Sequence, residues 1–187
     1  MAVVPRTRPI TAEEYFALDL PERRTQLVNG EIVVNEPSAR HQRIAGEVYA
    51  LIRQWCRAEP ARGEAFLPLD VHLGRHDVYA PDVLWVSEAR RPRREALRLD
   101  APPDLAVEVR SPSTWRHDLH VKKGVYESTG LPELWLVDTA ADTVLVFRRS
   151  APGGPAFDAG SELGRGKQLT TPLLPGLAID LDELFDR

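Results

Sequence analysis

Two acidic residues of this chain occupy positions where a solvated surface charge is not the expected explanation. Asp82 follows a proline and opens the apolar segment 83–86, and Glu108 interrupts the apolar segment 105–109. Both segments have the β-branched and aromatic composition of strands. A carboxylate inside such a strand needs an ion-pair partner or a bound metal, because burying an unpaired charge is costly. Asp82 and Glu108 are therefore the first candidates for chemistry.

Lys122 supplies a positive charge further along the chain. It lies four residues after Asp118, so both residues share one face of the helix expected there. Two acids on neighbouring strands with a lysine nearby form an oxygen-rich site suited to Mg²⁺. Such a site can hydrolyse a phosphodiester, because the metal lowers the pKa of a bound water and the ammonium stabilises developing charge.

Each of these residues also has a purely structural interpretation. Asp82 could be an ordinary turn acid, since Asp commonly follows Pro in turns. Glu108 could form an ion pair with Arg110 or with another arginine. Lys122 could pair with Asp118 on the helix surface. The spacing of these residues is compatible with both interpretations, because two acids and a lysine at loose spacing also occur by chance.

The elements that must position these residues follow from the periodicity of the sequence. Capping signals predict a helix over 11–18 and a long amphipathic helix over 38–58, and Asn29-Gly30 predicts a hairpin over 27–34. Further strands are expected at 65–73, 82–86, 105–109, 133–137 and 143–147, and further helices at 119–128 and 180–185. The glycine-rich segment 150–166 is expected to be a loop or a hairpin tip. This order predicts an α/β or α+β fold with a mixed β-sheet flanked by helices.

Composition restricts the class of protein. A length of 187 residues predicts a single domain, 1–187. A net charge of -4 excludes an overall basic surface, so any contact with nucleic acid must come from a local patch. The single cysteine, Cys56, excludes a disulfide framework and a multi-cysteine zinc site, and it fits a reducing compartment. No apolar run approaches the ~18 residues of a membrane span, and the N-terminus lacks signal-peptide features, so we expect a cytoplasmic protein that does not bind membranes.

An ordered series of motifs resembles the Uma-two family of restriction endonucleases, which is assigned to the PD-(D/E)xK nuclease superfamily. The motifs are Pro81-Asp82, the segments 103–114 and 118–122, Tyr126 and the segment 130–138. The likeness runs from Thr11 to the segment 174–180 and so covers almost the whole chain. It implies a restriction-endonuclease-like core and metal-dependent cleavage of nucleic acid, with Mg²⁺ or Mn²⁺ as the cofactor.

The resemblance also implies roles for individual residues. Asp82 is the acid of the PD element and Glu108 the acid of the (D/E)xK element, both as metal ligands. The wider superfamily has a lysine two residues after that glutamate, where this chain has Arg110, which can hold a phosphate but substitutes poorly for a lysine beside the attacking water. Lys122 on the next helix is expected to take that role. Relatives usually have an acid where this chain has Gln26, and an amide there would weaken a second metal site.

Further residues are expected around this site. We expect nucleic-acid contacts from His41, Arg110, Ser111, Ser113, Arg91 and Arg94, and supporting roles for Asp118 and Tyr126. Structural alternatives remain here too: a capping or solvated His41, serines that shape a turn, and a core position for Tyr126. The arginine run over 90–98 could equally be a solvated loop.

Taken together, the residues predict a Mg²⁺-dependent endonuclease that hydrolyses phosphodiester bonds, with DNA as the expected substrate. The alternative is a catalytically inactive nuclease-fold module that binds nucleic acid or a protein partner. Gln26 and Arg110 favour this alternative, whereas an intact set of Asp82, Glu108 and Lys122 favours the enzyme. A homodimer is compatible with either function.

Overall fold

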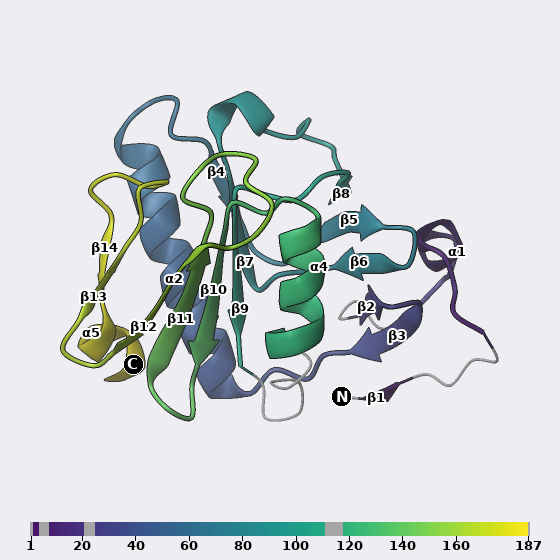
Figure 1. Cartoon of the computed structure of the whole chain (residues 1–187), viewed down its shortest axis with the longest axis horizontal. Helices are drawn as coiled ribbons and strands as arrows, with labels where there is room; N and C mark the ends of the chain where they lie inside the picture. Colours follow the sequence, from purple (N-terminus) through teal and green to yellow (C-terminus); the bar gives the residue numbers. More distant parts are fainter. Residues whose placement is uncertain (1, 4–7, 21–24, 111–117, 187) are drawn as a thin grey trace.

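The computed structural model describes residues 2–3, 8–20, 25–110 and 118–186, and its core contains two six-stranded sheets (Figure 1). The first sheet has the strand order β1 (Ala2–Val3), β3 (Glu31–Val34), β2 (Thr25–Val28), β6 (Asp77–Tyr79), β5 (Asp70–Gly74) and β8 (Arg98–Leu99). The second has the order β12 (Ala159–Gly164), β11 (Thr143–Arg148), β10 (Glu133–Asp138), β9 (Leu105–Val109), β7 (Val83–Val86) and β4 (Glu64–Phe66). Both sheets are mixed, because β5 and β8 run parallel, as do β9 and β10, among antiparallel neighbours.

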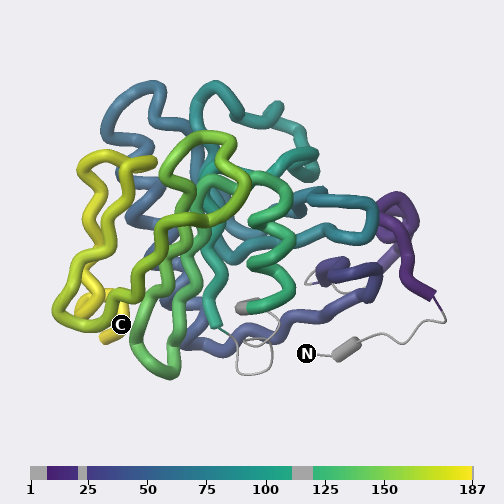
Figure 2. The backbone as a smooth tube through the Cα atoms, in the orientation of Figure 1, coloured from purple at the N-terminus to yellow at the C-terminus, as the bar shows by residue number. Residues whose placement is uncertain are grey.

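The remaining elements cover these sheets. The helices are α1 (Ala12–Phe16), α2 (Ala39–Ala58), α4 (Lys123–Ser128) and α5 (Leu181–Asp186), with a short 3-10 helix η1 (Glu88–Arg90) and a π-helical turn η2 (Asp118–Lys122). A small two-stranded sheet pairs β13 (Gln168–Thr170) with β14 (Ala178–Asp180). Figure 2 shows the N-terminal first sheet on one side of the second sheet and the C-terminal β13, β14 and α5 on the other. Among the described residues, no helix combines the length and the apolar character that a membrane span requires.

Local sequence signals explain where the early elements begin. The N-cap of α1 is a capping box, in which Thr11 Oγ1 accepts from the Glu14 amide at 3.2 Å and Glu14 accepts from the Thr11 amide at 2.8 Å. Asn29 and Gly30 both have positive φ, 50° and 77°, which is the backbone of the tight turn that suits a two-residue hairpin between β2 and β3. The two elements predicted from these motifs are therefore confirmed.

The central helix α2 begins at Ser38, as the sequence predicts. The Ser38 hydroxyl accepts a hydrogen bond from the amide of His41 at 3.2 Å. Ile44, Val48 and Ile52 then recur at helical spacing and are fully buried against the second sheet. This packing fixes the first turn of α2, and with it His41, beside the strands that carry the two acids.

The second sheet is buried on both faces, by α2 on one side and α4 on the other (Figure 1). Alternate residues of β9 belong to different clusters: Val107 packs on the α2 side, and Ala106 packs on the side of Tyr126 in α4. By this alternation Glu108 lies on the α4 side. The acid therefore enters an apolar layer from the middle of the sheet.

Three expectations about the strands need correction. The segment 65–73 is not one strand, because β4 belongs to the second sheet and β5 to the first, and Pro68 lies between them. The segment 150–166 contains the edge strand β12, whose two glycines and polar Ser161 and Glu162 hide the strand pattern. The sheet expected from the sequence is divided into two six-stranded sheets. The α/β class with mixed sheets and few helices is confirmed.

Candidate active site

Asp82 and Glu108 are brought together by the pairing of two adjacent strands. Strand β7 runs antiparallel to β9, with Val83 opposite Val107. Extending this register by one residue places Asp82, directly before β7, opposite Glu108. Opposed residues of an antiparallel pair have Cα atoms only about 4.5–5.5 Å apart. The sequence prediction that these two acids are neighbours is thus matched by the backbone.

Asp82 is buried and held from two directions. Its Oδ2 accepts a hydrogen bond from the Val109 amide at 2.8 Å and lies 3.1 Å from His41 Nε2. Burial alone would lower the pKa of His41, but its hydrogen bond to Asp82 and the negative charges of Asp82 and Glu108 outweigh burial and raise that pKa. The two carboxylates therefore favour the protonated form of this buried imidazole. His41 is only 6% exposed, which excludes both the solvated role and an open surface contact in this conformation.

Glu108 is surrounded by polar groups from the segment that follows β9. Its Oε2 lies 3.0 Å from Lys122 Nζ, and its Oε1 accepts a hydrogen bond from the Tyr126 hydroxyl at 2.8 Å. Lys122 ends the π-helical turn η2 and Tyr126 lies four residues later in α4, so both point at the same carboxylate. The side chains of Glu108 and Lys122 are 4% and 6% exposed, which makes this a buried ion pair.

An aromatic pair shields this ion pair. The rings of Tyr79 and Tyr126 meet edge to face with centroids 5.4 Å apart, and Lys122 Nζ lies 5.7 Å from the centroid of Tyr79. Tyr79 was not among the residues expected at the site, because β6, the short strand that carries it, has no clear signal in the sequence. The only local hint is its place three residues before Asp82.

Gln26, the amide that replaces an acid of the relatives, is buried in β2. It is 2% exposed, and its Oε1 has no hydrogen-bond partner in the part of the chain that the structure describes. It shares a face of β2 with Val28, which packs in the same cluster as Tyr79 and Tyr126. The amide thus belongs to the layer that contains Glu108 and Lys122.

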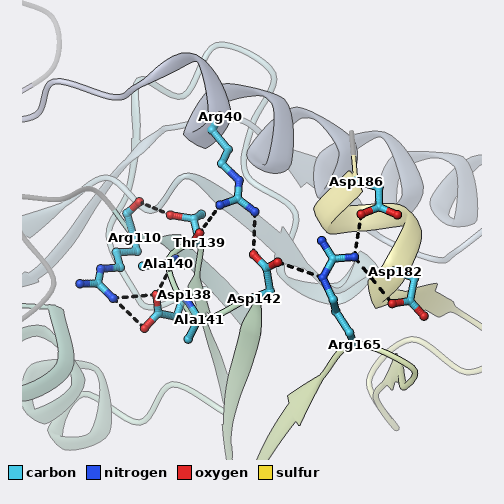
Figure 3. A network of polar contacts seen from close by, with 10 residues as sticks. All are labelled: Arg40, Arg110, Asp138, Thr139, Ala140, Ala141, Asp142, Arg165, Asp182 and Asp186. Atoms are coloured by element: carbon cyan, nitrogen blue, oxygen red, sulfur yellow. Dashed lines mark hydrogen bonds and ion pairs between the residues drawn. The ribbon is translucent and has the colours of Figure 1, made fainter.

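Arg110 is occupied by a different carboxylate from the one considered in the sequence. Its guanidinium donates to both oxygens of Asp138, at 2.7 and 2.8 Å (Figure 3). Among the contacts described, Glu108 pairs with Lys122 and Arg110 pairs with Asp138. Arg110 lies two residues beyond Glu108, at the end of β9, and a phosphate contact from it stays a prediction.

Arg91 and Arg94 lie at the opposite end of the strands from the acids. Because β7 and β9 are antiparallel, the connection between them leaves the edge farthest from Asp82 and Glu108. A four-residue strand spans about 13 Å at ~3.3 Å per residue. Arg91 forms ion pairs with Glu64 at 3.0 Å and Glu88 at 3.1 Å, and Arg94 is exposed. The structure does not bring these arginines to the acid pair.

Three of the expected site residues cannot be placed in this way. Ser111 and Ser113 lie outside the described residues. The backbone of Asp118 lies in η2, and its side chain lies outside what the structure describes. Their expected roles stay predictions.

The side chains of Asp82 and Glu108 are the available ligands for Mg²⁺ at this site. In the described ranges, no three His, Cys, Asp or Glu residues are grouped so that they could hold a metal ion. Asp82 and Glu108 are the two carboxylates on adjacent strands, and Asp82 Oδ1 is not used in any described hydrogen bond. Mg²⁺ commonly takes one or two protein carboxylates and keeps several waters, so this pair fits it.

The fold matches that of a solved structure. A protein from Anabaena variabilis ATCC 29413, described as "a putative nuclease belonging to DUF820", superposes with a TM-score of 0.81 over 95% of this chain and 98% of that chain. Sequence identity is 23%, so the likeness establishes a shared fold. The chain therefore has the mixed α/β fold of that solved structure.

The family is shown by the sequence itself. The model of the Uma2 family, described as "Putative restriction endonuclease", matches residues 12–182. The chain belongs to the Uma2 family, and the resemblance inferred from the motifs is confirmed. Among curated proteins, none matches the sequence.

Proposed function

We propose that this protein is a metal-dependent endonuclease that hydrolyses phosphodiester bonds of DNA. The observation that carries the proposal is the convergence of three buried charges from separate elements: Asp82 before β7, Glu108 in β9 and Lys122 at the end of η2. Burying charges is expensive, and such clusters are common where chemistry requires them. Membership of the Uma2 family supports the same reaction class.

Each residue has a distinct task in this proposal. Asp82 and Glu108 hold Mg²⁺ or Mn²⁺, which when bound polarises the phosphoryl oxygen and lowers the pKa of a water. Tyr126 fixes one oxygen of Glu108, and His41 fixes one oxygen of Asp82. An ammonium has three N–H donors, so Lys122 can hold Glu108 and orient the attacking water together. Arg110 and the serines at 111 and 113 would contact phosphate at the end of β9.

A catalytically inactive module that binds nucleic acid or a protein partner is the second candidate. The observation that favours it is the engagement of both Glu108 oxygens, by Lys122 and by Tyr126. A neutral Gln26 in the same layer reduces the negative charge available to a cation. Such a module would keep the fold and lose metal binding. A homodimer remains compatible with either function.

Calorimetric titration with Mn²⁺ separates the two candidates without a choice of substrate. We expect the wild type to bind Mn²⁺ and Glu108→Ala to lose binding. Asp82→Asn should also lose it, and this substitution keeps an acceptor for the Val109 amide and so protects the fold. Asp100→Asn is the matched control, because it removes an exposed acid of the connection between β7 and β9, at the far end of these strands, and should bind Mn²⁺ like the wild type.

Cleavage of a supercoiled plasmid with Mg²⁺ then tests the activity in the same proteins. Product from the wild type and none from Glu108→Ala is the expected result. Metal-dependent cleavage that persists in Glu108→Ala would exclude this site assignment. A folded wild type that binds no Mn²⁺, either alone or with nucleic acid, would favour the binding module.

A further inference from the structure

A second polar depression lies at the other end of α2 from the acids. It has a volume of about 520 Å³ and is formed by the last three turns of α2, by β4 and by the chain that follows β4. Its charged lining consists of three arginines, Arg53, Arg57 and Arg91, and one carboxylate, Glu64. In a chain with a net charge of -4, this is a local excess of positive charge.

The two arginines from α2, Arg53 and Arg57, form no ion pair with an acid among the described residues. Within the described ranges, neither Arg53 nor Arg57 has a hydrogen bond or an ion pair, whereas Arg91 is held by Glu64 and Glu88. Arg57 lies in the last turn of α2, where the helix dipole favours a positive charge. Arg53 lies one turn earlier, so the dipole does not account for it.

We propose that this arginine pocket binds a phosphate of the nucleic-acid backbone, remote from the acid pair. Guanidinium groups present several N–H donors that match phosphate oxygens, and phosphate contacts of this kind position a nucleic acid without reading its sequence. The proposal rests on the proposed nuclease function, and it identifies a second contact region for the same substrate. Arg91 belongs to the arginine run over 90–98 and lines this pocket, so the proposal also gives that run a contact with nucleic acid although it lies far from the acids.

The α2 axis sets the separation of the two regions. His41 lies at the acid pair, and Arg53 and Arg57 follow it by 12 and 16 residues. At 1.5 Å per residue these positions are about 18 and 24 Å along the helix. Each strand of a duplex rises about 3.4 Å per nucleotide, so the pocket would engage a phosphate roughly five to seven nucleotides from the one at the acids.

Cys56 provides a built-in reporter, because it is the chain's single cysteine and it lines this pocket. Burial raises the pKa of the Cys56 thiol, so its reaction with a maleimide should be slow and sensitive to an occupant. We would measure this reaction for the full-length protein in EDTA at mildly alkaline pH, with and without a 20-base-pair duplex. Inorganic phosphate at the same phosphate concentration forms a separate arm.

Fluorescence anisotropy of the same duplex, over a range of salt concentrations, tests the arginines directly. We expect Arg53→Ala and Arg57→Ala each to weaken binding several-fold and to reduce the slope of log K against log salt by about one. Arg165→Ala removes the same charge at a remote exposed position and is the control. Glu64→Gln removes the carboxylate that lines the pocket and leaves Arg91 paired with Glu88 alone, so it should strengthen binding.

The outcomes separate this inference from the nuclease itself. Protection of Cys56 by the duplex, together with the reduced slopes, supports the arginine pocket. Intact binding and cleavage with unchanged slopes and an unprotected Cys56 would overturn the pocket and leave the nuclease standing. Equal protection by inorganic phosphate would show a site for small anions and overturn the backbone contact. A wild type that binds no duplex at all would overturn both.

Discussion

The protein places carboxylates against cations in two regions that differ in their contact with water. Around Glu108 and Lys122 the paired side chains are 4% and 6% exposed. In the network of Figure 3, Arg165 is 40% exposed, and its partners Asp142 and Asp186 are 25% and 68% exposed. The same kind of pair therefore exists in a desolvated and in a hydrated form. The desolvated form is costly to build, so its presence is better explained by function than by stability.

The hydrated network has a clear structural task. Asp142, in the turn between β10 and β11, accepts from Arg40 of α2 at 2.6 Å and from Arg165 at 2.9 Å (Figure 3). Arg165 also reaches Asp186 of α5 at 2.7 Å. These contacts connect four segments at the surface: α2, the turn between β10 and β11, the chain directly after β12, and α5. Because solvent screens them, each contributes little on its own.

Breaking the buried pair should give the largest change in stability. Lys122→Met leaves the Glu108 charge buried without its cation, and we expect the free energy of unfolding to fall by about 3–5 kcal/mol. The double substitution Glu108→Gln with Lys122→Met should recover most of this loss, because neither charge remains. Urea denaturation at neutral pH measures both. A single substitution that costs less than about 1 kcal/mol would contradict a desolvated pair.

Removing the support of Asp82 should have an intermediate effect. His41→Ala removes one of the two hydrogen bonds at Asp82 Oδ2, and loss of such a supporting group typically weakens metal binding about 10- to 100-fold. Mn²⁺ calorimetry measures the change. Gln42→Ala, at the next and exposed position of α2, is the control and should bind like the wild type. Equal affinities of His41→Ala and the wild type would remove His41 from the site.

The exposed network should give the smallest effect. Asp142→Asn weakens its two arginine contacts, and we expect a loss of less than about 1 kcal/mol in the free energy of unfolding that disappears at high salt. Burial has the largest single effect on the pKa of Asp142 and raises it, but the hydrogen bonds and positive charges of Arg165 and Arg40 together outweigh burial and lower that pKa from its ordinary value.

The sign of the pH dependence follows from this shift. The stabilisation by Asp142 is present above the ordinary carboxyl pKa and is lost as the pH falls through the lowered value of the folded state. Unfolding curves of wild type and Asp142→Asn should therefore converge in acid. A difference that persists at the lowest pH would assign the effect to packing instead of charge.

Local patterns were sufficient to predict the strands that carry the acids and the cap of α2. The bounds of β9, for example, follow from one largely apolar run that ends in the sequence just before Arg110-Ser111-Pro112. The resemblance carried the remaining site residues. It was the ordered motif series that connected Glu108 with Lys122, 14 residues away, and that connection matches the ion pair.

Contacts between distant segments were not predictable in the same way. His41 and Asp82 are 41 residues apart, and their hydrogen bond depends on how α2 crosses the end of β7. The pairing of Arg110 with Asp138 depends on the parallel register of β9 and β10. The sequence does not specify which carboxylate pairs with a given arginine. The register of the sheet strands decides which of them come close together.

The hydrogen bond from the Val109 amide to Asp82 gives this acid two kinds of selective constraint. One of its oxygens closes the backbone at the end of β9, a task that any descendant with this fold must still perform. A lineage that abandoned cleavage would therefore still be expected to keep an acceptor at this position, so among relatives the presence of this aspartate alone does not mark retained activity.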